Sequence, residues 1–124
     1  MVKFRAEAVF AGEIPNADCD AVILSEHSDG RSGRRLEIQR AWSFSAQDKR
    51  LGQDKYAICT EDGTTHYGGI VAWRLLGNRL ELSLDSDAAD VFSVDMFSVE
   101  MIADSSRLRA VQDMLCKILD LGKN

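Results

Sequence analysis

The chain contains few residues of the types that build disulfide frameworks, metal sites and membrane spans. Its 124 residues include three cysteines, two histidines and one proline. Cys19, Cys59 and Cys116 are odd in number and widely spaced, which fits neither a disulfide framework nor a metal-ligand pattern. No apolar run approaches the ~18 residues that a membrane helix needs. We therefore expect reduced thiols, no cofactor and no bound metal.

The N-terminus also lacks a secretion signal. Lys3, Arg5 and Glu7 interrupt the apolar residues before a signal-peptide core can form. A protein without such a signal stays where it is made, and reduced thiols are the normal state in that compartment. We expect a cytoplasmic protein that forms one domain over residues 1–124, a length that fits a single hydrophobic core.

Positive charge is scarce in the second half of the chain. Fifteen basic residues stand against twenty acidic ones, and residues 60–124 hold six basic and eleven acidic residues. A net charge of −5 repels phosphate backbones and anionic lipids, so nucleic acid and membranes are poor candidate partners. Residues 80–106 contain acids but no lysine or arginine, and could steer a basic protein partner. The partner contacts predicted there are Glu81, Asp85, Asp87, Asp90 and Asp95.

Period-two alternation dominates the first hundred residues and predicts a mostly β fold. Turn signals such as Asp62-Gly63 and Gly77-Asn78 separate the apolar runs by short connections, which favours antiparallel hairpins. We expect an α+β, mostly β domain: an antiparallel sheet of six to seven strands, curved or barrel-like, with one C-terminal amphipathic helix. The predicted strands are Val2–Phe10, Ala21–Leu24, Leu36–Arg40, Tyr56–Thr60, Ile70–Leu76, Leu80–Leu84 and Phe97–Ile102.

The remaining segments read as turns, loops and helix. Residues 12–16 and 26–35 are expected to be a turn and a polar loop, and residues 86–91 a single helical turn. From about Ser105 to Leu121 the apolar residues follow a helical stripe, and Gly122 is placed as a C-terminal stop. This helix should pack against the sheet.

The adjacent glycines in Tyr67-Gly68-Gly69-Ile70 are unusual because they stand at the entrance of a predicted strand. Glycine weakens strands through backbone entropy and missing side-chain contacts. A pair in this position therefore indicates a bulge, a sharp bend or the close approach of another backbone.

Two small groups of residues offer catalytic or metal chemistry. Cys59 and His66 lie across a plausible hairpin and could face each other as thiol and base, in a pocket that also holds Tyr67. The alternative, which we favour, is a buried strand cysteine beside a solvent-facing histidine. Residues 85–90 contain three aspartates that could attract calcium, but acids at the start of a helix explain them better.

A basic loop and the terminal helix complete the candidate binding elements. Arg31, Arg34 and Arg35 could clamp an anion, but we favour a solvated, flexible surface loop. The exposed face of the terminal helix could pair two copies of the chain, but nothing in the sequence supports a homo-oligomer.

Several motifs, taken in order, resemble the immunity protein 10 family. They are Leu36-Glu37-Ile38-Gln39-Arg40, Gln47-Asp48, Leu51-Gly52-Gln53-Asp54-Lys55-Tyr56 and Tyr67-Gly68-Gly69-Ile70. With the leucine-alternating hairpin that follows, they cover about residues 36–90. The resemblance implies a small, mostly β, non-enzymatic protein of bacterial polymorphic toxin systems. It would bind a cognate toxin domain and neutralise it by stoichiometric inhibition.

We expect the motif residues themselves to shape the fold rather than to contact the toxin. They are Gln39, Arg40, Gln47, Asp48, Leu51, Gly52, Asp54, Tyr56, Tyr67, Gly68, Gly69 and Ile70. The competing hypothesis is a small ligand-binding module or enzyme that uses a pocket near Cys59, His66 and Tyr67.

Overall fold

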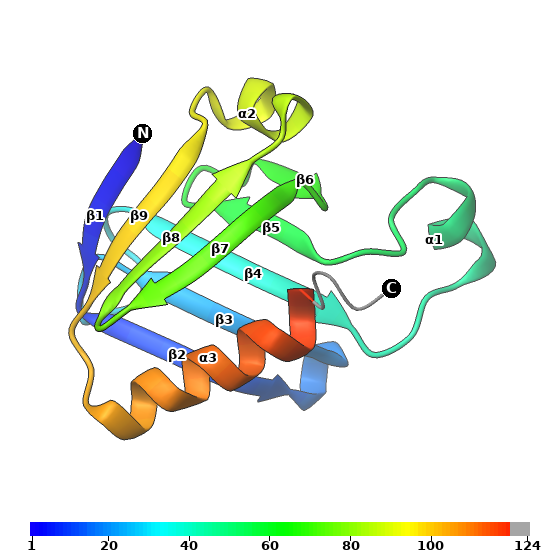
Figure 1. Ribbon diagram of the computed structural model, residues 1–124. Coiled ribbons are helices and arrows are strands. Elements are labelled where there is room, and N and C mark those ends of the chain that lie inside the picture. The colour runs from blue at the N-terminus through cyan, green and yellow to red at the C-terminus, as the bar shows by residue number, and fades with distance from the viewer. Residues whose placement is uncertain (120–124) are drawn as a thin grey trace.

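Two β-sheets and one long helix make up the part of the chain that the computed structural model describes, residues 1–119 (Figure 1). The four-stranded sheet has the order β1-β9-β8-β7, and the five-stranded sheet has the order β2-β3-β4-β5-β6. The strands are β1 (Val2–Ala6), β2 (Ala8–Ile14), β3 (Cys19–Ser25), β4 (Arg35–Ala41), β5 (Ala57–Thr60), β6 (Thr65–Tyr67), β7 (Ile70–Leu76), β8 (Arg79–Leu84) and β9 (Met96–Met101). The helices are the 3-10 turn η1 (Pro15–Ala17), α1 (Ala46–Arg50), α2 (Ser86–Phe92) and α3 (Ser105–Leu119).

The predicted class, mostly β with a C-terminal amphipathic helix, is confirmed. The sheet is not closed into a barrel, because the strands divide between two sheets. Pairing is antiparallel except between β1 and β9, which run parallel and place Phe4 beside Val99. The described residues contain nine strands rather than six or seven, since one predicted strand, Val2–Phe10, is divided in two and β6 is too short to show a sequence pattern.

The first predicted strand, Val2–Phe10, is wrong because the chain bends at Glu7. Phe4 and Ala6 point into the core from β1, but Val9, not Phe10, points inward from β2. The bend therefore shifts the alternation by one residue and sends the two strands into different sheets. The turn expected at residues 12–16 is also displaced, since β2 continues to Ile14 before η1 turns the chain.

The core lies between the inner face of the five-stranded sheet and a layer made of the four-stranded sheet and α3 (Figure 1). Along α3, Val111, Leu115 and Ile118 are fully buried, as the helical stripe predicts. Burying one such aliphatic side chain contributes about 1.5–3 kcal/mol. The helix packs on β2, β3 and β4. The predicted stop at Gly122 lies outside the described residues.

Polar contacts fix the C-terminal end of α3 on the sheet. Arg40 Nη1 donates to the Ile118 carbonyl at 3.1 Å, and Lys117 Nζ lies 3.2 Å from the buried Asp20 carboxylate. Because the Arg40 contact occupies a carbonyl near the helix end, it satisfies a group that the helix cannot pair internally. Within residues 1–119, no helix is long and apolar enough to cross a membrane.

Candidate functional site

The two glycines of the Tyr67–Ile70 motif carry the chain from one sheet to the other. Strand β6 ends at Tyr67 in the five-stranded sheet, and β7 begins at Ile70 in the four-stranded sheet. Gly68 and Gly69 have φ angles of 72° and 102°, in the left-handed region that side chains rarely tolerate. A Cβ added at Gly69 would lie 2.6 Å from the Ala88 Cβ. The pair therefore makes the expected sharp bend, and the close approach at Gly69 is that of the Ala88 side chain rather than of another backbone.

Hydrogen bonds hold this crossing between the two sheets. The Gly68 amide donates to the Tyr56 carbonyl, and the Asp85 amide donates to the Gly69 carbonyl, both at 2.8 Å. The Tyr56 hydroxyl accepts from the Ile70 amide at 2.8 Å. Burial raises the pKa of this hydroxyl above its ordinary value, so it stays neutral and able to accept and donate.

The Gln47–Tyr56 stretch of the motif contains a short helix that sequence patterns did not predict. Ser45 and Asp48 form a capping box at the start of α1: the Asp48 amide donates to Ser45 Oγ at 3.0 Å, and the Ser45 amide donates to Asp48 Oδ2 at 2.9 Å. Gly52 follows the helix with φ of 70°. Gln47 and Leu51 are exposed, and Asp54 is half-buried.

A hollow of about 280 Å³ opens between α1 and the five-stranded sheet. Three motif residues from separate segments converge on it: Gln39 from β4, Asp48 from α1 and Tyr67 from β6. The remaining lining residues are Ala17, Cys19, Ala41, Phe44, Gln53, Lys55 and Ala57. Most of these were missed as site residues because strand register, not sequence proximity, brings them together. Gln53 and Lys55 lie within the motif stretch that the sequence did single out.

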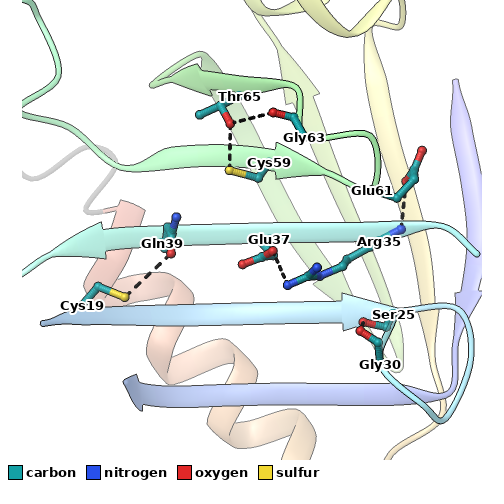
Figure 2. Close-up of polar contacts among 10 residues, drawn as sticks. All are labelled: Cys19, Ser25, Gly30, Arg35, Glu37, Gln39, Cys59, Glu61, Gly63 and Thr65. Atoms are coloured by element: carbon teal, nitrogen blue, oxygen red, sulfur yellow. Dashed lines mark hydrogen bonds and ion pairs between the residues drawn. The ribbon is translucent and has the colours of Figure 1, made fainter. Parts of the chain in front are cut away.

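The floor of the hollow is part of the side of the five-stranded sheet that faces away from the core. We call this side the outer face. Cross-strand register places Ala21 beside Gln39, Gln39 beside Ala57, and Ala57 beside Tyr67 on it. Cys19 Sγ lies 3.7 Å from Gln39 Oε1 (Figure 2), and burial, followed by the nearby Asp20 charge, raises the pKa of this thiol. Cys19 is therefore a poor nucleophile at neutral pH.

Cys59 and His66 do not face each other, so the thiol–base arrangement is wrong. Cys59 pairs with Thr65, whereas His66 pairs with Ile58, so the cysteine and histidine point to opposite faces of the sheet. Cys59 Sγ lies 3.1 Å from Thr65 Oγ1 on the outer face (Figure 2). On the other face, His66 Nδ1 donates to the Gly68 carbonyl at 3.0 Å. The histidine is half-buried rather than solvent-facing.

The acidic stretch is divided between two places in the fold. Asp85 caps α2 by accepting from the Ala88 amide at 2.9 Å, as expected for an acid at the start of a helix. Asp87, Asp90 and Asp95 are exposed on or beside α2. Glu81 lies instead on the four-stranded sheet and accepts from Arg74 Nε at 2.8 Å. In residues 1–119, no cluster of three or more metal-ligand side chains could hold an ion.

The basic loop is organised by acidic side chains around it. The Arg34 amide donates to Glu26 Oε1 at 2.8 Å, and the Arg35 guanidinium pairs with Glu37 (Figure 2). The Asp29 carboxylate accepts from the amides of residues 31 and 32, and these bonds hold its pKa at about 2, below the usual 3.8. Arg35 is therefore engaged with a carboxylate rather than available as an anion clamp.

Comparison with known proteins agrees with the motif resemblance and extends it along the chain. A family model for immunity protein 10 matches residues 5–109. This range includes both sheets almost entirely, the crossing at Gly68-Gly69 and the hollow. No curated protein matches the chain. The match spans well over half of the sequence, and the chain belongs to the immunity protein 10 family.

Proposed function

We propose that this protein binds a cognate bacterial toxin domain and neutralises it by stoichiometric inhibition. The observation that carries the proposal is the family match over residues 5–109, because immunity proteins protect cells against toxins by binding them. One inhibitor blocks one toxin domain, with no turnover. The protein would act in the cytoplasm of the toxin-producing cell and its kin, as part of a polymorphic toxin system.

The geometry gives no support to the alternative of an enzyme or small-molecule binding module using Cys59, His66 and Tyr67. A cysteine nucleophile needs a base within hydrogen-bond reach, and here the two side chains lie on opposite faces of a sheet. The hollow beside Tyr67 contains the thiol of Cys19, whose raised pKa disfavours the reactive thiolate.

The net charge supports a basic toxin domain as the partner. A protein of charge −5 attracts a basic domain over a distance and speeds the encounter. Asp87, Asp90 and Asp95 are exposed near one another in sequence and are not ion-paired in the described part of the chain. A nuclease with a positive nucleic-acid groove is one class of toxin with this charge.

Co-expression tests the proposal directly. The toxin domain encoded immediately upstream is expected to kill cells that lack this protein and to spare cells that make it. Titration of the purified toxin should then reach full inhibition at one equivalent of the protein. Killing that continues in cells with normal levels of the folded protein would contradict the proposal.

A further inference from the structure

The two sheets present outward surfaces of very different charge. Sixteen residues of the five-stranded sheet lie on the outer face, and the only charged ones, Arg35 and Glu37, are paired with each other. The sixteen outer-face residues are Ala8, Phe10, Gly12, Ile14, Cys19, Ala21, Ile23, Ser25, Arg35, Glu37, Gln39, Ala41, Ala57, Cys59, Thr65 and Tyr67. Eleven residues of the four-stranded sheet point outward, and six of them are charged. The eleven outward residues are Lys3, Arg5, Ala72, Arg74, Leu76, Arg79, Glu81, Ser83, Met96, Ser98 and Glu100.

This contrast matters because 28% of the chain is charged and the two longer helices, α2 and α3, pack on other surfaces. Helix α3 covers the inner face of the five-stranded sheet, and α2 contacts β8. Among residues 1–119, the α1 segment lies against the outer face at the end where the hollow is, and the loop after β3 contacts it at the other end, where Ser25 Oγ donates to the Gly30 carbonyl at 3.4 Å. Removing water from a broad sheet surface with few charges costs little free energy, and protein interfaces are depleted of charged residues at their centres.

The outer face has the shape expected of a docking surface, with small residues along its middle and aromatic rings at its edges. One row across the five strands has small residues at Gly12, Ala21 and Ala57, with Gln39 between them and Tyr67 at its end. These small residues lie below the larger side chains around them, so that Ala21 is fully buried and Ala57 is 6% exposed, and Ala57 lines the hollow. Aromatic rings border this row at both sheet edges. The Phe10 ring lies over Gly12, 3.4 Å from where a Cβ would stand, and Phe10 and Tyr67 are each 39% exposed.

The dimensions suit a protein partner that inserts one side chain. The three seven-residue strands β2, β3 and β4 are roughly 24 Å long, and the five strands together are roughly 19 Å wide, narrowing at β5 and β6. The α1 segment extends this area towards the roughly 800 Å² per partner of a standard interface. The hollow, at about 280 Å³, lies at the lower end of the roughly 300–1,000 Å³ of small-molecule sites and is also large enough for one large side chain. Its apolar walls, Phe44 and Ala57, and its amides, Gln39 and Gln53, fit a large uncharged side chain with a polar tip. The two charged residues of the lining, Asp48 and Lys55, have opposite signs, and the Asp48 carboxylate already accepts from the Ser45 amide.

We propose that the outer face is the toxin-docking surface and that the hollow receives one large, uncharged side chain from a charge-poor segment of the toxin. This inference rests on the proposed function. The acids near α2 steer the approach, whereas contact at the outer face holds the complex. Docking on the four-stranded sheet would instead require six charged side chains to lose water, of which only Arg74 and Glu81 are paired with each other. Four of the six are basic and would repel a basic toxin.

Filling the hollow tests the proposal with a matched control. Ala41 is exposed and lines the hollow, so Ala41→Trp should occupy it without disturbing the core. Ala72 is exposed on the outward side of the four-stranded sheet, so Ala72→Trp makes the same change elsewhere. Calorimetry with the purified toxin domain should show a Kd raised at least 100-fold for Ala41→Trp and within twofold of wild type for Ala72→Trp. Both variants should keep the wild-type thermal midpoint.

A charge placed on the same face gives a second, independent measurement. Thr65 is exposed on β6, and Thr65→Lys should raise the Kd at least tenfold, while Ala72→Lys should leave it unchanged. Wild-type affinity in both Ala41→Trp and Thr65→Lys would overturn the inference and leave the proposed function standing. The inference is also overturned if the free protein sediments as a dimer that Ala41→Trp dissociates. A wild-type protein that neither binds the toxin nor protects cells would instead remove the proposed function.

Discussion

The phenolic oxygen of Tyr56 lies 2.8 Å from the amide nitrogen of Ile70, across the point where the chain passes from the five-stranded to the four-stranded sheet. Ile70 begins β7, and its amide is buried. Tyr56, which directly precedes β5 in the five-stranded sheet, therefore supplies the hydrogen-bond acceptor for the first backbone amide of β7 in the four-stranded sheet. Two motif residues 14 positions apart join the layers of the fold in this way.

Removing the Tyr56 hydroxyl should destabilise the protein. In Tyr56→Phe the buried Ile70 amide loses its acceptor, and an unsatisfied buried donor costs about 1–3 kcal/mol. Urea denaturation followed by circular dichroism measures the free energy of unfolding. Tyr67→Phe is the control: Tyr67 is 39% exposed, and a surface change of this kind should stay within about 0.5 kcal/mol. Equal stability of the two variants would contradict the role of the hydrogen bond.

Gly69→Ala should destabilise more than Gly63→Ala. Both glycines have positive φ, 102° and 85°, so each substitution introduces backbone strain of about 1–2 kcal/mol. Only at Gly69 would the new Cβ lie 2.6 Å from Ala88, whereas nothing lies within 4 Å at Gly63. We expect a loss of about 3 kcal/mol or more for Gly69→Ala, because overpacking adds to the strain. Thermal or urea unfolding compares them, and a smaller loss at Gly69 would refute the close approach.

The loop at residues 26–35 should be sensitive to strong acid. The pKa of Asp29 is lowered to about 2 by hydrogen bonds from residues 31 and 32, so the folded loop favours the ionised form. Its contribution to loop stability is therefore present above pH 3.8 and is lost as the pH falls through 2. Carboxyl carbon NMR shifts titrated between pH 5 and pH 1.5 measure this pKa. A midpoint near 3.8 would mean that the turn is not held by this carboxylate.

Neutralising the acids near α2 should slow association with a basic toxin without changing dissociation. The triple variant Asp87→Asn, Asp90→Asn, Asp95→Asn removes steering charge, so its association rate should fall several-fold at low salt and approach that of wild type at high salt. The control variant Glu7→Gln, Glu13→Gln, Asp113→Asn removes the same charge from other exposed sites. Stopped-flow or biosensor kinetics separate the two rates. A large rise in the dissociation rate of the first variant would place the acids in the interface.

Sequence patterns predicted the elements whose period is uninterrupted. Leu80, Leu82 and Leu84 alternate strictly and are buried in β8, and the helical stripe of α3 places Val111 and Leu115 in the core. The same logic failed at Glu7, where one bend shifts the alternation by a residue. Periodicity cannot reveal such a bend, because both halves keep a period of two.

The hollow could not be predicted because it depends on register between strands distant in sequence. Gln39 meets Ala57 and Ala57 meets Tyr67 only once β4, β5 and β6 are aligned. The glycine pair was recognisable as a bend or close approach, but its role as the link between two sheets required the strand order. For Cys59 and His66 the sequence left a facing pair open and favoured the reading without one, and the strand register places the two side chains on opposite faces.

Alkylation of the native cysteines tests most directly the claim that the toxin docks on the outer face. Cys59 is half-buried on that face, and Cys116 is exposed on α3, so the chain carries its own probe and its own control. Iodoacetamide labelling of the free protein and of the one-to-one complex, read by mass spectrometry, measures both rates in one sample. We predict that bound toxin slows the alkylation of Cys59 at least tenfold and leaves that of Cys116 within twofold. Unchanged alkylation of Cys59 in a fully formed complex would contradict the account.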